Sequence, residues 1–298
     1  HSTFAGPNAQ LNEVLDEYFD PGKTPIADRL DDLLGSLAQF CRRTGIKPEE
    51  ILLRGDAQLG TPATIARLNS HGFHFLFKGR SPNRAQVLAR EVEAETVFWR
   101  VENGAERLPR WMADLGERQH RDESVGSRGQ VITARTLLLA RQEWAARGKR
   151  PGKTTRAKQA TQPRAKVAKL DYYLTDLNAR ELPVEMVLPT YDDRVTIERY
   201  FCDEQYALGA KHVRTKHFAG AAFFQFLVAT TNNLLRWLQH STFRQTEIEQ
   251  LGLGRLVRQA MQIPARLKRL GKKLIVELPR QHHLVKQLVA SWSELAPP

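Results

Sequence analysis

Cysteine is scarce in this sequence, which has only Cys41 and Cys202 among its 298 residues. The two are far apart and show no CxxC spacing, so they cannot build a disulfide framework or a zinc site. A long apolar run is also lacking, because the best candidate, 218–238, is interrupted by polar residues. The sequence therefore predicts a protein of a reducing compartment, with segment 218–238 as a buried helix.

Several catalytic motifs are missing as well. No GxSxG or HExxH occurs, so the serine hydrolase and zincin classes have no support. A Walker A loop is imitated at 148–155, but Gly148 and Gly152 are separated by three residues where that loop has four. The His71/His74 and His282/His283 pairs have no further Cys or His at metal-ligand spacing. Surface or core histidines are the simpler interpretation of both pairs.

Negative charge is under-represented: 45 Lys and Arg stand against 33 Asp and Glu, a net charge of +12. Clustered positive charge binds polyanions by neutralising phosphates and releasing their counterions, which favours nucleic acid as the partner. The plainer alternative is a solvated basic surface. Segment 147–169 contains no acidic residue at all, which indicates either a mobile loop that lies along phosphates or a solvated linker.

The first part of the chain alternates helices and strands. Apolar residues at helical spacing predict a helix over 25–44, and a short apolar run predicts a strand over 51–53. A second helix is expected to begin after the N-cap Thr61 and to end at Gly72, followed by a strand over 73–79 and a helix over 81–95. This order predicts an α/β fold with parallel strands.

After residue 97 the pattern changes to a β-rich segment, with strands predicted over 97–104, 131–144 and 167–177. From residue 183 the chain is mainly helical, with one continuous helical region over 183–210. Further helices are predicted over 220–238 and 246–262, and a late strand over 273–278. The expected domain boundaries are thus 1–96, 97–170 and 171–298.

Two groups of residues are candidates for chemistry. Asp56 follows the carboxyl end of a predicted strand, where α/β sheets place ligands and where a carboxylate can bind a metal ion; a simple turn aspartate is the alternative. Tyr191, Arg194 and Glu198 are spaced to share one face of the predicted helix. An ordinary polar helix face is the alternative there, but a phosphate-processing site needs these three chemistries together.

The triplet Tyr191-x₂-Arg194-x₃-Glu198 resembles most of the Y-x₂-R-x₃-E-x₆-K signature of bacterial insertion-sequence transposases with a DDE active site. Segments 52–79, 207–238 and 263–279 resemble further parts of that family in the same order. The resemblance implies an α/β fold: an RNase H-like core, incomplete at its N-terminus, with a β-rich insertion and a mainly helical C-terminal part.

The resemblance also implies roles for particular residues. Asp56 matches the second catalytic acid and Glu198 the third, and both are expected to bind metal: two Mg²⁺ ions, with Mn²⁺ as the alternative. Tyr191 and Arg194 match positions that contact DNA phosphates. The last signature position is Gln205 instead of Lys, so a positive charge that would contact phosphate is missing there. Lys211 would have to supply that charge. Further DNA-binding candidates are Arg150 and Lys153 of the basic loop.

The first catalytic aspartate has no match. Asp16, Asp20, Asp28, Asp31 and Asp32 are all predicted to lie in loops or helices without a preceding strand. We therefore expect the chain to be part of a longer transposase, one that binds DNA but cleaves it poorly or not at all by itself.

The implied function is DNA cleavage and strand transfer of an insertion sequence, acting on double-stranded DNA at the element ends and target. A synaptic homodimer, a cytoplasmic, nucleoid-associated location and no membrane contact are expected with it. Two alternatives remain: a catalytically inactive DNA-binding remnant, and an RNase H-like nuclease without strand transfer.

Overall fold

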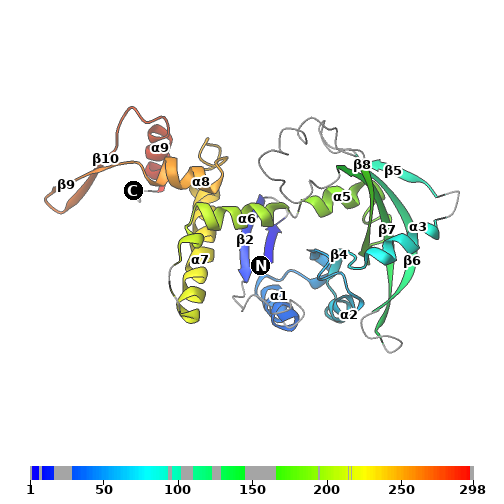
Figure 1. Cartoon of the computed structure of the whole chain (residues 1–298). Helices are drawn as coiled ribbons and strands as arrows, with labels where there is room; N and C mark the ends of the chain where they lie inside the picture. Colours follow the sequence, from blue (N-terminus) through cyan, green and yellow to red (C-terminus); the bar gives the residue numbers. More distant parts are fainter. Residues whose placement is uncertain are drawn as a thin grey trace, which may run out of the picture. The chain divides into compact units, whose positions relative to one another are not determined.

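The computed structural model describes residues 2–6, 9–16, 29–92, 96–101, 110–122, 129–144, 166–193, 195–213, 215 and 217–295. The chain divides into two compact units (Figure 1). The sheet unit is Thr24–Arg194, and the helical unit joins His1–Lys23 to Val195–Pro298. Each unit is described by itself.

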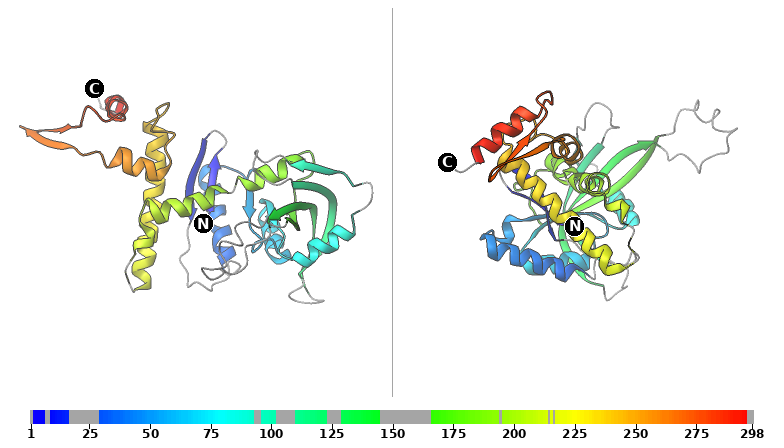
Figure 2. Two further views of the ribbon diagram at one scale, coloured as in Figure 1. Left: turned by 45° about the horizontal axis from the view of Figure 1, so that its top comes forward. Right: turned by 90° about the vertical axis from the view of Figure 1, so that its left-hand side faces the viewer.

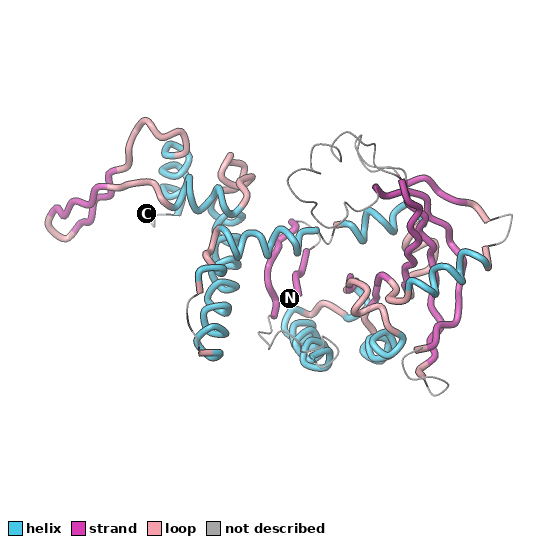
Figure 3. The backbone as a smooth tube through the Cα atoms, viewed as in Figure 1, coloured by secondary structure: helices cyan, strands magenta, loops and turns pink. Residues whose placement is uncertain are grey.

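The sheet unit is built on six strands in the order β3-β4-β8-β7-β6-β5 (Figure 3). Their bounds are β3 Leu52–Gly55, β4 His74–Lys78, β5 Phe98–Val101, β6 Arg110–Arg121, β7 Val131–Trp144 and β8 Lys166–Thr175. β3 and β4 are parallel, and every other neighbouring pair is antiparallel. The strands of the predicted β-rich segment therefore extend the same sheet that contains β3 and β4.

Within the described residues, the α-helices of this unit are α1 Leu30–Thr44, α2 Pro62–His71, α3 Pro82–Arg90 and α5 Val184–Asp192. A short 3₁₀ turn, η2, covers Pro48–Glu50. The hydroxyl oxygen of Thr61 accepts from the amide of Thr64, and Gly72 ends α2 in the left-handed conformation at φ 77°. Both signals of the sequence are confirmed, because local capping chemistry determines these ends.

The core of the sheet unit lies between α5 and the middle strands. Leu137 and Leu139 of β7 are buried with Tyr173 of β8 against Val187 and Leu188 of α5. A fully buried side chain of this size contributes about 1.5–3 kcal/mol relative to exposure. This cluster holds α5 on the sheet.

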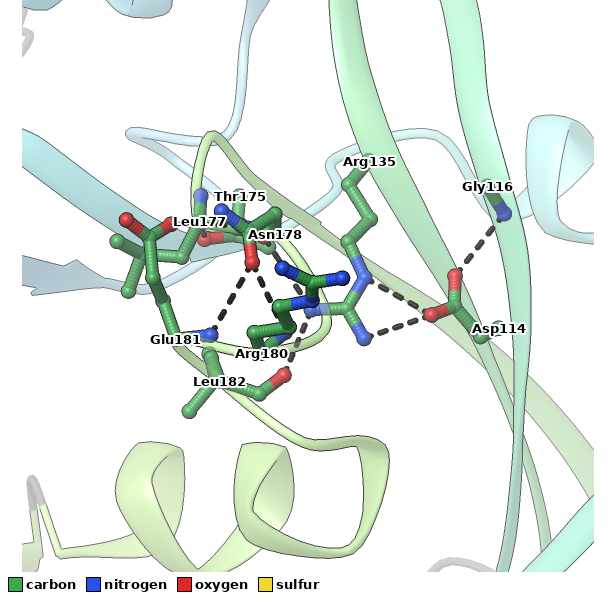
Figure 4. A network of polar contacts seen from close by, with 9 residues as sticks. All are labelled: Asp114, Gly116, Arg135, Thr175, Leu177, Asn178, Arg180, Glu181 and Leu182. Atoms are coloured by element: carbon green, nitrogen blue, oxygen red, sulfur yellow. Dashed lines mark hydrogen bonds and ion pairs between the residues drawn. The ribbon is translucent and has the colours of Figure 1, made fainter.

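A buried arginine reinforces the same region (Figure 4). Arg135 of β7 donates to the Asp114 carboxylate of β6 through Nε at 2.9 Å and Nη2 at 2.6 Å. Its Nη1 donates to the carbonyl oxygens of Leu177 at 3.2 Å and Leu182 at 2.7 Å. The guanidinium thus fixes the segment that leads into α5.

The helical unit contains most of the C-terminal helices (Figure 2). Its elements are the antiparallel hairpin β1 Ser2–Gly6 and β2 Ala9–Asp16, helix α6 Val195–Tyr206, turn η4 Ala210–His212, helix α7 Phe218–Thr242, helix α8 Leu253–Arg255, π-helical η5 Leu256–Met261, the hairpin β9 Arg266–Leu270 and β10 Lys273–Glu277, and helix α9 Val285–Leu295. A core forms around Phe243, Ile248, Leu253 and Leu284. The chain is therefore α/β with a mainly helical C-terminal part, as predicted.

Two expectations about these elements were wrong. Asp16 was predicted to have no strand before it, but β2 ends at this residue. The overlooked signal is the turn-forming sequence Gly6-Pro7-Asn8, which separates the two strands of the hairpin. A hairpin and a helix, α1, therefore precede the strand of Asp56.

Helix α7 was predicted to be buried, yet its large apolar side chains are mostly exposed. Phe223, Phe226, Leu234 and Trp237 are each about 60% exposed, at 61, 62, 59 and 58%. By length and composition alone α7 would suffice to cross a membrane, a test that core helices of soluble proteins also pass. The apolar composition thus predicted the helix correctly, but it did not predict that the large apolar side chains of α7 are exposed.

Candidate active-site residues

Asp56 directly follows β3, at the carboxyl end of a strand that is parallel to β4. Its side chain is exposed, and Oδ1 accepts from the amide of Gln58 at 2.9 Å. The carbonyl oxygen of Asp56 also accepts from the amides of Leu59 and Gly60. The residue therefore closes a tight turn, and within the described residues its Oδ2 has no hydrogen-bond partner.

The turn is held tightly against β4 by a glycine. A Cβ atom on Gly60 would lie 1.9 Å from the carbonyl oxygen of Lys78, so no larger residue fits without a shift of the backbone. The position of Asp56 at the edge of the sheet is thus determined by backbone packing rather than by its own side chain.

The predicted continuous helix over 183–210 is interrupted, which corrects the prediction. α5 ends at Asp192 and α6 begins at Val195. In an uninterrupted helix the carbonyl of Thr190 would accept from the amide four residues later. Here it accepts from Nη1 of Arg54 at 2.6 Å, and the same nitrogen is 3.1 Å from Oδ2 of Asp193. A distant arginine thus binds a carbonyl near the end of α5.

Arg54 was not recognised as a site residue from the sequence. It precedes Asp56 by two positions, and it joins the strand of that aspartate to residues 136 and 139 positions later. Arg110 of β6 adds a second bond, from Nη2 to Oδ2 of Asp192 at 2.7 Å. The end of α5, where the signature residues begin, is therefore bonded to β3 through Arg54 and to β6 through Arg110.

Tyr191 lies inside the sheet unit. It is 4% exposed, and its ring meets that of Tyr173 edge to face at a centroid distance of 4.8 Å. Burial, with the neighbouring Tyr191, raises the pKa of Tyr173. The structure thus assigns Tyr191 a packing role in the core.

The remaining predicted residues belong to other places. Glu198 lies on α6 of the helical unit, and its side chain is not among those described. Arg194, Arg150 and Lys153 fall outside the described residues. Lys211 is exposed on η4, with Nζ 3.9 Å from the ring centroid of Tyr206. Gln205 is exposed near the end of α6.

One further carboxylate on α6 was missed. Glu204 is 4% exposed, and its Oε1 accepts from the hydroxyl of Tyr200 and from Nε2 of Gln225, the latter at 2.8 Å. Burial raises the pKa of Glu204, and the hydrogen bond from Tyr200 opposes that rise. These contacts join α6 to α7, which is a structural role.

Metal ligands were also sought as groups. Among the described residues, no three His, Cys, Asp or Glu side chains are gathered so that they could hold an ion. Asp56 is therefore the described carboxylate available to a cation at the end of β3, and its hard oxygen atoms suit Mg²⁺.

Comparison with protein-family models identifies a family for this chain. The family model described as transposase DDE domain group 1 matches residues 8–297. No curated protein matches the chain significantly. The family match spans nearly the whole chain, and the α/β architecture is consistent with a DDE domain of RNase H-like fold. The chain therefore belongs to the transposase family of DDE domain group 1.

Proposed function

We propose that this chain catalyses metal-dependent cleavage of DNA at the ends of an insertion sequence, followed by strand transfer, with Asp56 and Glu198 as metal-binding acids. The observation that supports this best is the bond from Arg54 to the carbonyl of Thr190. This bond joins β3, the strand before Asp56, to α5, the helix that comes before the helix of Glu198 in the chain.

The chemistry follows from family membership and the available oxygens. Bound Mg²⁺ ions supply Lewis acidity that activates water and stabilises charge on the phosphate oxygens. The carboxylate of Asp56 contributes through Oδ2, because Oδ1 accepts the Gln58 amide. Water attacks the phosphorus at the element's end and displaces the 3′-oxygen of the element's terminal nucleotide, which leaves the phosphate on the flanking DNA. The freed 3′-hydroxyl of the element then displaces a 3′-oxygen in the target.

The DNA contacts are part of the same proposal. Arg194, Lys211, Arg150 and Lys153 are the basic residues that we assign to phosphates. The role of Tyr191 in DNA binding rests on the resemblance alone, since its ring packs in the core. A synaptic homodimer and a cytoplasmic, nucleoid-associated location complete the proposal.

The first test is cleavage of DNA carrying the element's ends by the purified chain in Mg²⁺. Asp56→Asn and Glu198→Gln are compared with Glu185→Gln, which removes an exposed carboxylate from α5. We expect both site variants to abolish any cleavage and the control to retain it. If the site variants cleave like the control, the assignment of both acids is wrong.

A second readout does not depend on turnover. Mn²⁺ binding followed by electron paramagnetic resonance should weaken by about tenfold or more in Asp56→Asn and remain unchanged in Glu185→Gln. Strand-transfer products distinguish a transposase from a nuclease. DNA binding without either metal affinity or cleavage would identify an inactive remnant instead.

A further inference from the structure

A pocket of about 510 Å³ lies in the sheet unit and adjoins the turn that follows Asp56, because Gly60 of that turn lines it. One wall is the start of α2 at Gly60 and Thr61, and another is the start of α3 at Ser81. The end of β6 and Tyr172 of β8 complete it. Pockets of this size hold small ligands or a portion of a larger one.

Three arginines dominate the charge of this pocket, which we call the arginine pocket: Arg80, Arg84 and Arg121. Among the described residues that line the pocket, Asp122 is the one acid, so three positive charges and one negative charge give these residues a net +2. His120 also lines it, but burial, with the charge of Arg84, lowers the pKa of His120 to about 4. The pocket is therefore cationic at neutral pH without any help from histidine.

The guanidinium groups are only weakly engaged by the protein. In the part of the chain that the structure describes, Arg80 and Arg121 have no hydrogen-bond or ion-pair partner, and both are exposed. Arg84 reaches the carboxylate of Glu91 and the carbonyl of Gln119, each at 3.4 Å, the long end of the hydrogen-bond range. Such groups are available to an external anion.

The backbone positions these arginines closely. A Cβ atom on Gly79 would lie 2.1 Å from the ring of Tyr172, so this glycine lets the chain before Arg80 lie against β8. The amide of Gly79 donates to the carbonyl of Tyr172 at 2.8 Å. The N-terminal ends of α2 and α3, ten and nine residues long, both line the pocket and add the positive ends of their dipoles there.

We propose that the arginine pocket binds a backbone phosphate of the DNA on which the chain acts. The planar guanidinium fork matches the paired oxygens of a phosphate, and two such forks are unoccupied here. This inference rests on the proposed function for its ligand, but it concerns a set of residues that includes neither Asp56 nor Glu198.

The test uses the full chain and a short duplex DNA, with affinity measured over a range of salt concentrations. The double variant Arg80→Gln/Arg121→Gln is compared with Arg43→Gln/Arg90→Gln, which removes two exposed arginines from α1 and α3 outside the pocket. We expect the pocket variant to bind about tenfold or more weakly, with a logarithmic salt dependence less steep by about 1.8 for two lost contacts. The control should match the wild type.

The outcomes separate the two proposals. If the wild-type chain does not bind DNA at all, the proposed function fails. If it binds DNA and the two double variants are equal, only the pocket assignment fails. A parallel arm measures thermal unfolding with inorganic phosphate or a mononucleotide. Stabilisation of the wild type by these small ligands, without a DNA-binding defect in the pocket variant, would identify a small-phosphate site and overturn the assignment to DNA.

Discussion

Replacing Arg135 by Met tests how strongly one buried guanidinium stabilises the sheet unit. The side chain of Arg135 is 7% exposed, and it makes four hydrogen bonds. Two go to the carboxylate of Asp114 on β6, and two go to carbonyl oxygens in the segment before α5. Methionine keeps the aliphatic stem but removes all donors. The carbonyl of Leu182 and the Asp114 carboxylate then lose their partner in a poorly hydrated place.

The magnitude follows from what remains. Breaking a buried ion pair costs about 3–5 kcal/mol, because one charge is left uncompensated. The Asp114 side chain is 27% exposed and still accepts from the amide of Gly116 at 2.9 Å. Water and that bond offset part of the loss, so we expect a decrease of about 3 kcal/mol in the free energy of unfolding.

Denaturant unfolding of the full chain, with hydrogen exchange of α5 and β7 amides, measures this cost. Arg29→Met is the control, since Arg29 pairs with Asp32 at the surface with side chains 43% and 53% exposed. That change should cost about 0.5 kcal/mol or less. The double variant Arg135→Met/Asp114→Asn should cost less than the sum of its single changes. Equal costs for Arg135→Met and Arg29→Met would refute the reasoning.

Two further predictions concern the surroundings of the arginine pocket. Since the pKa of His120 falls from 6.5 to about 4 on folding, its contribution is complete above pH 6.5 and is lost as pH falls toward 4. The free energy of unfolding should therefore fall by up to about 3 kcal/mol over this pH range. This pH dependence should be shallower in His120→Gln, and equal dependence in the wild type and the variant would contradict the prediction. Gly79→Ala forces a methyl group against Tyr172 and should destabilise by about 1–3 kcal/mol, whereas Gly35→Ala, with nothing within 4 Å in α1, should stabilise by about 0.5–1 kcal/mol. Thermal unfolding of both glycine variants measures these effects. If Gly79→Ala were stabilising, the backbone at Gly79 and the ring of Tyr172 would not be held rigidly against each other.

The elements around Asp56 could be predicted because their signals are local. The cap at Thr61 and the stop at Gly72 each depend on residues within one turn of the chain. The turn after β3 likewise depends on Asp56 and its immediate neighbours. Short-range hydrogen bonds of this kind act in the same way whatever the rest of the fold does.

β6 could not be predicted by the same means. Its sequence places Met112 and Ala113 next to each other, both fully buried, so it lacks strict alternation of apolar and polar residues. An irregularity between Asp114 and Glu117, with Gly116 at φ 69°, also shifts its register. Its strand conformation depends on pairing with β5 and β7, the strands before and after it in the chain, and not on an apolar pattern of its own.

The interruption between α5 and α6 changes the argument for the signature residues. Offsets of three and seven place Tyr191, Arg194 and Glu198 on one face only if the helix is continuous. α5 ends within the sheet unit, where Arg54 binds the carbonyl of Thr190, and α6 belongs to the helical unit. Helical spacing therefore cannot determine how Tyr191 and Glu198 face each other. The catalytic role that we propose for Glu198 rests instead on family membership and on its place in the signature triplet.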